Sequence, residues 1–240
     1  MALIKRKFDW KNDMIFTFWE GYMPDYIRLC METWKHEYTV LNYDNLSNYT
    51  DLQITPELLR FTYPQIADCV RVHVLRDQGG CWLDCDTIMI TGKMPDTNMI
   101  GDPVERTQTI GYLRSEAHSP MYEEWAAYQD GVIRNPYASH GWSVMGNDFT
   151  DLYVRQHKDI TICSVDKCWP EVYMIKDTVP RHEKYQKFYF ENDYHMTDIR
   201  PTDMLMLHNS WTPSWYKDMC FEDILKRRCT LSNILNEVMK

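Results

Sequence analysis

The sequence contains no long hydrophobic run. Its longest uninterrupted apolar stretches, of which Val172–Ile175 is one, have four residues, whereas a membrane-spanning helix needs roughly 20. The basic residues Lys5, Arg6 and Lys7 are not followed by the apolar segment of a secretory signal. We therefore expect no transmembrane segment and no signal peptide, and we interpret the basic cluster as a surface patch.

Positive charge is also scarce. The chain has 26 Lys and Arg against 35 Asp and Glu, a net charge of −9, so its overall field repels a polyphosphate backbone and argues against nucleic-acid binding. Hydrophobic residues make up 44% and charged residues 25% of the chain, which is typical of globular proteins and not of disordered ones. Because α/β folds of about 250 residues close around one core, we expect one domain over residues 1–240.

None of the eight cysteines forms a tight CxxC pair. Cys81 and Cys85 are four residues apart, and Cys163 and Cys168 are five apart, which is near the ligand spacing of zinc sites. A chain of this size needs no disulfides to complete its core. We therefore interpret the cysteines as reduced and mostly buried small hydrophobic residues, with a zinc site as the alternative.

Strand and helix patterns alternate at the start of the chain. The aromatic and apolar segment Met14–Trp19 predicts a buried strand that ends before Gly21. Apolar residues at helical spacing after Pro24 predict a helix, and Tyr38–Leu41 predicts a second strand. This strand, helix, strand order is typical of a parallel sheet with helices packed on it.

Similar patterns continue to the end of the chain. Thr55–Phe61 predicts a short helix, and a longer helix is predicted over 65–79, with Pro64 separating the two. We expect an α/β fold with a mostly parallel central sheet. The remaining predicted elements are strands at Cys81–Leu83, Ile160–Cys163, Val172–Ile175 and Met204–Leu207, and helices at 119–128 and Leu231–Val238.

The most informative segment runs from Ala67 to Ile90. A helix, a Gly-Gly stop and a short apolar strand lead there to Asp84 and Asp86. Because residues i and i+2 of an extended chain project to one side, both carboxylates are expected to face a single cation. Carboxylate oxygens are ligands that Mg²⁺ and Mn²⁺ prefer, and open α/β sheets bind ligands at the carboxyl ends of strands. A bare pair of this spacing is more often a solvated loop, so the longer pattern around it carries the interpretation.

That longer pattern resembles the DxD-containing region of the family 32 glycosyltransferases and of the related capsular polysaccharide synthesis proteins. The segment Ile15–Lys35 (IFTFWEGYMPDYIRLCMETWK) is similar to the start of capsular-type proteins, and Leu207–Trp215 (LHNSWTPSW) is similar to their C-terminal segment. The resemblance implies a single Rossmann-like domain of GT-A glycosyltransferase fold. It also implies transfer of a sugar from a nucleotide-diphosphate donor, expected to be a UDP-sugar, to a saccharide acceptor in surface glycan synthesis.

The resemblance implies a metal cofactor, Mn²⁺ or Mg²⁺, that bridges the donor diphosphate to the protein. By the family's pattern, Asp86 is a metal ligand, Asp84 contacts metal, ribose or sugar, and His208 completes the coordination or touches the diphosphate. A cation in that position offsets the charge that develops on the departing nucleotide diphosphate. The alternative for His208 is a structural role.

Donor binding is the role that the resemblance implies for five further residues. Asp68 and Arg71 would hold sugar hydroxyls, and the alternative is an intrahelical ion pair worth about 0.2 to 0.5 kcal/mol. Trp19 would stack on the nucleobase, and the alternative is core packing. Phe18 and Trp215, in the two terminal segments that carry the resemblance, complete the expected donor-binding set.

A catalytic carboxylate is expected in the segment His140–Phe149 (HGWSVMGNDF), where the similar enzymes place an acceptor-side loop. Asp148 is the candidate, as the base that accepts the proton of the acceptor hydroxyl. The alternative is that Asp148 caps a helix beginning near Phe149. The segment departs from the small-residue and proline loop of capsular-type members, and both inversion and retention stay open.

Two other functions stay open from the residues alone. A metal-dependent nucleotide-sugar hydrolase would share the diphosphate site, but a saccharide acceptor would not accelerate its consumption of the donor. A non-catalytic carbohydrate-binding module could use some of the aromatic residues, 14% of the chain, as stacking platforms, but it would not need the two aspartates. Without a predicted membrane anchor, we expect a soluble cytoplasmic enzyme, bacterial or virus-encoded.

Overall fold

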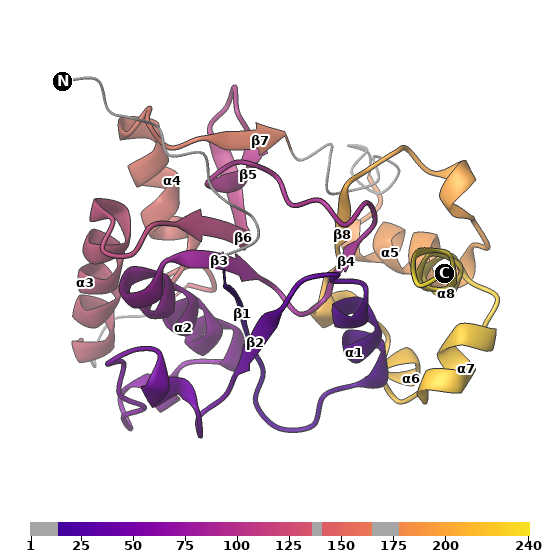
Figure 1. The fold of residues 1–240 in the computed structure, drawn as a ribbon, viewed down its shortest axis with the longest axis horizontal. Coiled ribbons are helices and arrows are strands. Elements are labelled where there is room, and N and C mark those ends of the chain that lie inside the picture. Colours follow the sequence, from indigo (N-terminus) through magenta and orange to yellow (C-terminus); the bar gives the residue numbers. More distant parts are fainter. Residues whose placement is uncertain (1–13, 136–140, 165–177) are drawn as a thin grey trace.

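A six-stranded sheet forms the centre of the molecule (Figure 1). The structure is a computed structural model that describes residues 14–135, 141–164 and 178–240. In the order in which they lie side by side, the strands are β2 (Tyr38–Leu41), β1 (Ile15–Phe18), β3 (Gly80–Leu83), β6 (Thr107–Ser115), β5 (Met99–Asp102) and β7 (Ile162–Ser164). The pairs β1–β2, β1–β3 and β5–β7 are parallel, whereas β6 runs antiparallel to both of its neighbours. The expected α/β class with a mostly parallel sheet is confirmed.

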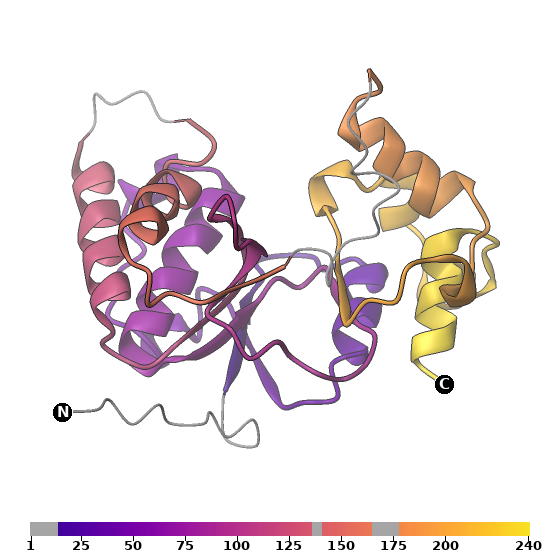
Figure 2. The same cartoon turned by 90° about the horizontal axis from the view of Figure 1, so that it is seen from above.

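Helices cover both faces of this sheet, and a second sheet of two antiparallel strands lies beside it. Figure 2 shows the C-terminal helices gathered at one end of the molecule. The second sheet consists of β4 (Thr87–Met89) and β8 (Met204–Met206). The helices are α1 (Asp25–Glu32), α2 (Tyr63–Gln78), α3 (Pro120–Arg134), α4 (Asn147–Gln156), α5 (Arg181–Gln186), α6 (Ser214–Lys217), α7 (Phe221–Lys226) and α8 (Thr230–Val238). Shorter helical turns are η1 (Leu46–Asn48), η2 (Leu58–Arg60), η5 (Lys187–Glu191), η6 (Met196–Asp198) and η7 (Asn209–Trp211).

The alternation of side chains along β1 and β3 separates two cores. Phe16 and Trp82 point to the face covered by α2 and α3, where they are fully buried in one hydrophobic cluster. Ile15, Cys81 and Leu83 point to the opposite face and join a second cluster with α1, β8 and the C-terminal helices. Because successive strand residues face opposite sides, these short strands are mostly apolar, as strands buried on both faces are, and the polar residue Thr17 of β1 is buried as well.

Several predicted boundaries shift in the structure. Helix α2 begins at Tyr63, so Pro64 lies in its first turn and does not separate two helices. Thr62 precedes this helix, and its backbone N–H donates to Gln65 Oε1 at 3.0 Å, which supplies the cap. The expected helix over Thr55–Phe61 is reduced to η2. The predicted strand Val172–Ile175 lies outside the described residues.

The position of β1 in the sheet defines a switch point. From β1 the chain moves to β2 on one side and later to β3 on the other, and all three strands are parallel. Ligands of open α/β sheets bind outside the carboxyl ends of the strands at such a point. The segments after β1 and β3 therefore mark the edge where a site is expected. Among the described residues, no helix has the length and apolar character needed to cross a bilayer.

Candidate functional site

Asp84 lies at the carboxyl end of β3, on the face of the sheet that α2 covers. It continues the alternation of that strand, and the indole N–H of Trp82 donates to Asp84 Oδ1 at 2.8 Å. The backbone N–H of Asp84 donates to the carbonyl of Gly111 on β6 at 2.9 Å. The side chain remains 35% exposed, so this carboxylate is both fixed in position and open to a ligand.

Arg71 of α2 connects two carboxylates at this edge. Its Nη2 atom lies 3.0 Å from Asp68 Oδ1 and 3.2 Å from Asp84 Oδ1. The guanidinium also donates to the carbonyl of Ile110 and lies over the Trp82 ring. The pairing of Asp68 with Arg71, one turn apart on a helix, is present as the sequence indicated, and Arg71 extends it to the strand end.

Burial raises the pKa of Asp68 to about 7. The negative charge of Asp84 acts in the same direction, while the Arg71 guanidinium opposes both. A carboxyl group that titrates near neutral pH inside a cleft is typical of a functional site, although structural ion pairs also perturb pKa values.

A pocket of about 360 Å³ opens over these groups. Two glycines make room for the carboxylates, since a Cβ on Gly111 would meet Asp84 Oδ2 at 2.8 Å and a Cβ on Gly146 would meet Asp68 Oδ2 at 3.1 Å. The walls come from α2, β6, the turn before α4, and the end of β8. The lining residues are Pro64, Asp68, Arg71, Asp84, Thr109, Ile110, Gly111, Trp142, Ser143, Asn147 and His208.

Asp86 has surroundings different from those of Asp84. The pair lies in the turn between β3 and β4, not in extended chain, so the expected projection to one side is not the actual geometry. Asp86 Oδ2 accepts the backbone N–H of Asn209 at 2.7 Å, next to His208. Burial, followed by the charge of Asp84, raises the pKa of Asp86 to about 7. The two carboxylates therefore interact although they bond to different partners.

His208 brings a third potential ligand to the same edge. Burial lowers its pKa to about 4, which keeps the imidazole neutral at physiological pH, and the charge of Asp84 opposes that shift. Its ring lies 4.0 Å from that of Trp211, measured between centroids. A neutral imidazole is the form that binds metals, so the protonation state fits the predicted role.

The donor set fits a divalent cation that is shared with a diphosphate. Within residues 14–135, 141–164 and 178–240, no three His, Cys, Asp or Glu side chains are arranged to hold a metal by themselves. Mg²⁺ in nucleotide sites is held by one or two carboxylates together with substrate phosphates, which requires fewer protein ligands. Asp84 and Asp86 supply such oxygens, and the pKa of Asp86 is raised first by burial and second by the charge of Asp84, a charge that a bound cation would offset.

The predicted aromatic residues do not line this pocket. Phe18 is buried in the core beside Tyr43. Trp19 is half-buried at the end of β1, packs against the other core, and donates its indole N–H to the carbonyl of Tyr22 at 3.1 Å. Trp215 lies on α6 under the guanidinium of Arg227. Trp19 therefore lies at the switch point of the sheet. Phe18 packs in the core, the role that was considered as the alternative for Trp19.

Asp148 is exposed in the first turn of α4, outside the pocket lining. The helix begins at Asn147 with Gly146 as its N-cap, so the alternative that Asp148 caps the helix is wrong. Its carboxylate accepts the hydroxyl of Ser143 at 2.5 Å, and Ser143 belongs to the pocket wall. The expected catalytic role of Asp148 stays a prediction.

Five of the seven described cysteines, including Cys81 and Cys85, are buried, as expected for small hydrophobic residues. Cys85 Sγ lies 2.9 Å from Thr17 Oγ1 inside the core. Burial raises the pKa of the Cys85 thiol to about 12, so this residue is held as a neutral thiol. Cys168 lies outside the described residues.

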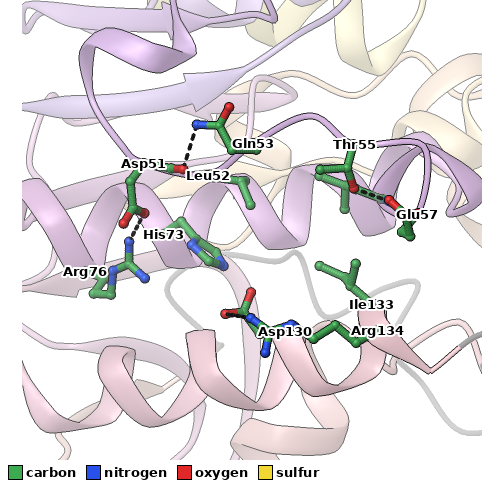
Figure 3. Close-up of a pocket in the computed structure, with 11 residues that line it drawn as sticks. Asp51, Leu52, Gln53, Thr55, Glu57, His73, Arg76, Asp130, Ile133 and Arg134 are labelled. Carbon is green, nitrogen blue, oxygen red and sulfur yellow. Dashed lines mark hydrogen bonds and ion pairs between the residues drawn. The ribbon is translucent and has the colours of Figure 1, made fainter.

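A second cavity, of about 410 Å³, lies between α2, α3 and the segment 51–58. Figure 3 shows His73 and Arg76 of α2 facing this space together with Asp130 and Arg134 of α3. Arg76 is already ion-paired with Asp51, and both ring nitrogens of His73 are buried without a hydrogen-bond partner among the described residues. The predicted site residues are all elsewhere, so we assign the functional site to the pocket at Asp84.

Sequence reasoning missed the part of the site contributed by β6, which includes Gly111. It expected an acceptor-side loop over His140–Phe149 but gave no role there to Trp142 and Asn147, which line the pocket. Asn147 Nδ2 donates to the carbonyl of Gln108 at 3.3 Å, which joins the turn to the strand. The tryptophan in the segment before α4 was the available signal, but nothing local in the sequence indicated that it lines the same pocket as Asp84.

A comparison with protein families finds one matching model, described as capsular polysaccharide synthesis protein, over residues 4–207. The match includes Asp68, Arg71, Asp84 and Asp86 and ends just before His208. No curated protein matches the chain.

Solved structures with a similar arrangement include two glycosyltransferases. PaToxG glycosyltransferase is 14% identical with a TM-score of 0.45, over 60% of this chain and 68% of that one. The glycosyltransferase GlyE of Streptococcus pneumoniae TIGR4 is 12% identical with a TM-score of 0.36, over 94% of this chain. This chain spans 62% of the length of GlyE.

Proposed function

The chain belongs to the capsular polysaccharide synthesis protein family, and we propose that it is a glycosyltransferase whose donor is a UDP-sugar bound with Mn²⁺ or Mg²⁺. The observation that carries the proposal is the position of Asp84. This carboxylate lies at the strand end beside the sheet's switch point, faces a pocket, and is held by a buried arginine. Nucleotide ligands of α/β sheets bind at such a point.

The proposed orientation of the donor follows the edge of the sheet. The nucleobase would lie after β1, near Trp19, and the diphosphate would lie at Asp84 and Asp86. The sugar would then extend into the pocket, where Asp68 and Arg71 offer a carboxyl group and a guanidinium to its hydroxyls. Planar donors and acceptors of this kind fix the orientation of a polar ligand in a pocket.

Asp84, Asp86 and His208 are the residues that would hold the metal. A bound Mn²⁺ or Mg²⁺ supplies charge stabilisation for the leaving nucleotide diphosphate. The protein residues supply the rest of the arrangement. Arg71 holds Asp84 in place, the Asn209 N–H orients Asp86, and neutral His208 offers a nitrogen lone pair.

In the reaction, the oxygen of the acceptor hydroxyl forms a bond to the anomeric carbon of the donor sugar. The bond from that carbon to the β-phosphate oxygen breaks, and UDP leaves with the electron pair. The hydroxyl proton is transferred to a base, for which Asp148 is the proposed residue if the reaction inverts configuration. If it retains configuration, a group on the donor side of the pocket stabilises the sugar cation, and the hydroxyl proton is transferred to the β-phosphate oxygen of the departing UDP.

The proposal is tested by calorimetry with UDP and by donor consumption with and without saccharides. We expect UDP to bind only when Mn²⁺ or Mg²⁺ is present, and a saccharide acceptor to accelerate release of UDP. Metal-dependent release of UDP that no saccharide accelerates would instead identify a hydrolase. Absence of UDP binding together with saccharide binding would identify a carbohydrate-binding module, and either result would overturn the proposal.

A further inference from the structure

Trp142 is a large aromatic residue left exposed at the mouth of the site. Its side chain is 66% exposed, yet it is part of the wall of the pocket that contains Asp84 and His208. Aromatic side chains, tryptophan among them, are enriched at binding interfaces relative to the rest of a protein surface. The family resemblance implies an acceptor-side loop over His140–Phe149, but it assigns a role there only to Asp148 and none to Trp142.

The turn that carries Trp142 is held by the hydrophobic core and by helix α3. The next two apolar residues, Val144 and Met145, are buried. The Met145 carbonyl accepts the indole N–H of Trp125 at 3.0 Å and the side-chain amide of Gln129 at 2.6 Å. These contacts fix the backbone of the turn, and the turn places Trp142 at the surface beside the pocket.

A second contact joins the same turn to the helix that carries Asp68 and Arg71. The side-chain amide of Gln65, in the first turn of α2, donates to the carbonyl of Gly141 at 3.0 Å. Ser143, the residue after Trp142, donates its hydroxyl to Asp148. The indole is thus held on the same framework as the donor-binding groups, next to the proposed catalytic carboxylate.

The order of the strands decides which ligand Trp142 meets. Along the sheet the order is β1, β3, β6, so the proposed nucleotide position after β1 lies on one side of Asp84. Thr109, Ile110 and Gly111 of β6 form the pocket on the other side, together with the turn that carries Trp142. A donor sugar at Asp84 would therefore separate the nucleotide from Trp142.

We propose that Trp142 is the stacking platform for a sugar ring of the acceptor saccharide. This inference rests on the proposed function and identifies a specificity-determining residue for its second substrate. The C–H groups on one face of a pyranose ring form an apolar surface, and an indole ring buries that surface while leaving the hydroxyls to polar groups at its edge. Thr109, Ser143 and Asn147 line the pocket as such polar groups.

The experiment compares three variants: Trp142→Ala, Trp142→Phe, and Leu152→Ala as the control. Leu152 is 63% exposed on α4 and does not line the pocket, so its removal reports the general effect of losing a surface hydrophobic residue. UDP affinity with Mn²⁺ is measured by calorimetry. Transfer is measured with whichever member of a panel of methyl glycosides and disaccharides the wild-type protein uses fastest.

For Trp142→Ala we expect the KM for the saccharide to rise about tenfold or more, with UDP affinity changed by less than about twofold. Trp142→Phe should recover part of the loss, and Leu152→Ala should match the wild type. An unchanged KM for the saccharide in Trp142→Ala would contradict the proposed stacking on the acceptor. A fall in UDP affinity by the same factor as the KM rises would also contradict it, because the effect would then not be specific to the acceptor. A wild-type protein that binds no UDP with Mn²⁺ would instead contradict the proposed function, so the two failures are distinguishable.

Discussion

Asp84 and Asp86 are separated by one residue, but the chain uses them differently. Asp84 is bonded to Trp82 and Arg71 at a pocket wall, while Asp86 is buried against the Asn209 backbone N–H. The negative charge of one raises the pKa of the other. The arrangement has a cost in the unliganded protein that a bound cation would offset, because like charges in a buried site disfavour ionisation.

Replacing Asp86 with Asn tests this account at the residue scale. The amide oxygen still accepts the Asn209 N–H, so the fold should survive, and the melting temperature at pH 8 should equal or exceed that of the wild type because a buried charge is removed. Mn²⁺-dependent binding of UDP, measured by calorimetry, should be lost. The matched control is Asp44→Asn, an exposed position, and normal metal-dependent binding in the Asp86 variant would contradict the proposed metal site.

Trp19→Ala tests the nucleobase position. If the indole stacks on the base, UDP affinity should fall by roughly 1 to 3 kcal/mol, measured by calorimetry. Trp19 is half-buried and packs against the core on the α1 face, so some loss of stability is expected as well. A folded variant with wild-type UDP affinity would show that packing is the only role of this side chain.

At the scale of elements, the helices and strands with a clear local apolar pattern were predictable from the sequence. Strands that depend on pairing with distant strands were not. Strands β1 and β2 and helix α2 follow from local apolar patterns and from Gly79, which ends α2 with a positive φ of 67°. Strands β5 and β6 were missed, because β5 is short with an irregular register and β6 mixes polar and apolar residues. Their pairing with distant strands determines them, and such pairing leaves little local signal.

The same difference explains which parts of the site were predictable. Asp68, Arg71 and Asp84 lie on one continuous helix-to-strand segment, so their proximity follows from local geometry. Gly111 and Trp142 reach the pocket only because β6 inserts beside β3 and because the turn before α4 packs on α3. Asp86 was expected in extended chain, but a turn from Asp84 to Thr87, closed by a 3.1 Å backbone hydrogen bond, changes its direction.

Gly111→Ala tests the contribution of β6 to the site. A Cβ at this position would meet Asp84 Oδ2 at 2.8 Å and Met206 Cε at 2.3 Å. The methionine end can move at low cost, whereas Asp84 is held by several bonds, so metal-dependent UDP affinity should fall while circular dichroism stays unchanged. The control is Gly131→Ala on α3, where nothing lies within 4 Å, and where Ala should raise stability by roughly 0.5 to 1 kcal/mol. Equal UDP affinity in both variants would show that a Cβ at position 111 does not displace Asp84.

Asp148→Asn tests the proposed base on α4. Loss of a negative charge in the first turn of a helix costs about 0.3 to 1 kcal/mol, so the variant should stay folded. Transfer should fall by about 10² to 10⁴-fold with UDP affinity intact if the carboxylate accepts the acceptor's proton. Asp151→Asn serves as the control, because Asp151 lies further along the same helix and accepts the Gln108 amide instead. Near-normal turnover would remove Asp148 from the chemical step.

Stability against pH is a property of the whole molecule, and Asp68 contributes to it with a definite sign. Its pKa is about 7 in the folded protein and about 3.9 in an unfolded chain. Between these values the folded state binds more protons than the unfolded state, so this group lowers the free energy of unfolding as pH rises, until the loss is complete above about pH 7. His208 acts in the opposite direction between about pH 4 and 6.5, because burial lowers its pKa to about 4.

A comparison of variants separates the two contributions. Asn at position 68 keeps an oxygen for Arg71 and carries no charge, so Asp68→Asn removes the titration of Asp68 while His208 stays in both proteins. We expect the stability of this variant relative to the wild type to rise between pH 5 and pH 8 by at least about 1.4 kcal/mol, the equivalent of one pKa unit. Urea unfolding at several pH values measures the difference, with exposed Asp44→Asn as the control that should run parallel to the wild type. Parallel curves for Asp68→Asn would mean that Arg71 stabilises the charged carboxylate enough to cancel the effect of burial, and that Asp68 is already ionised at pH 5.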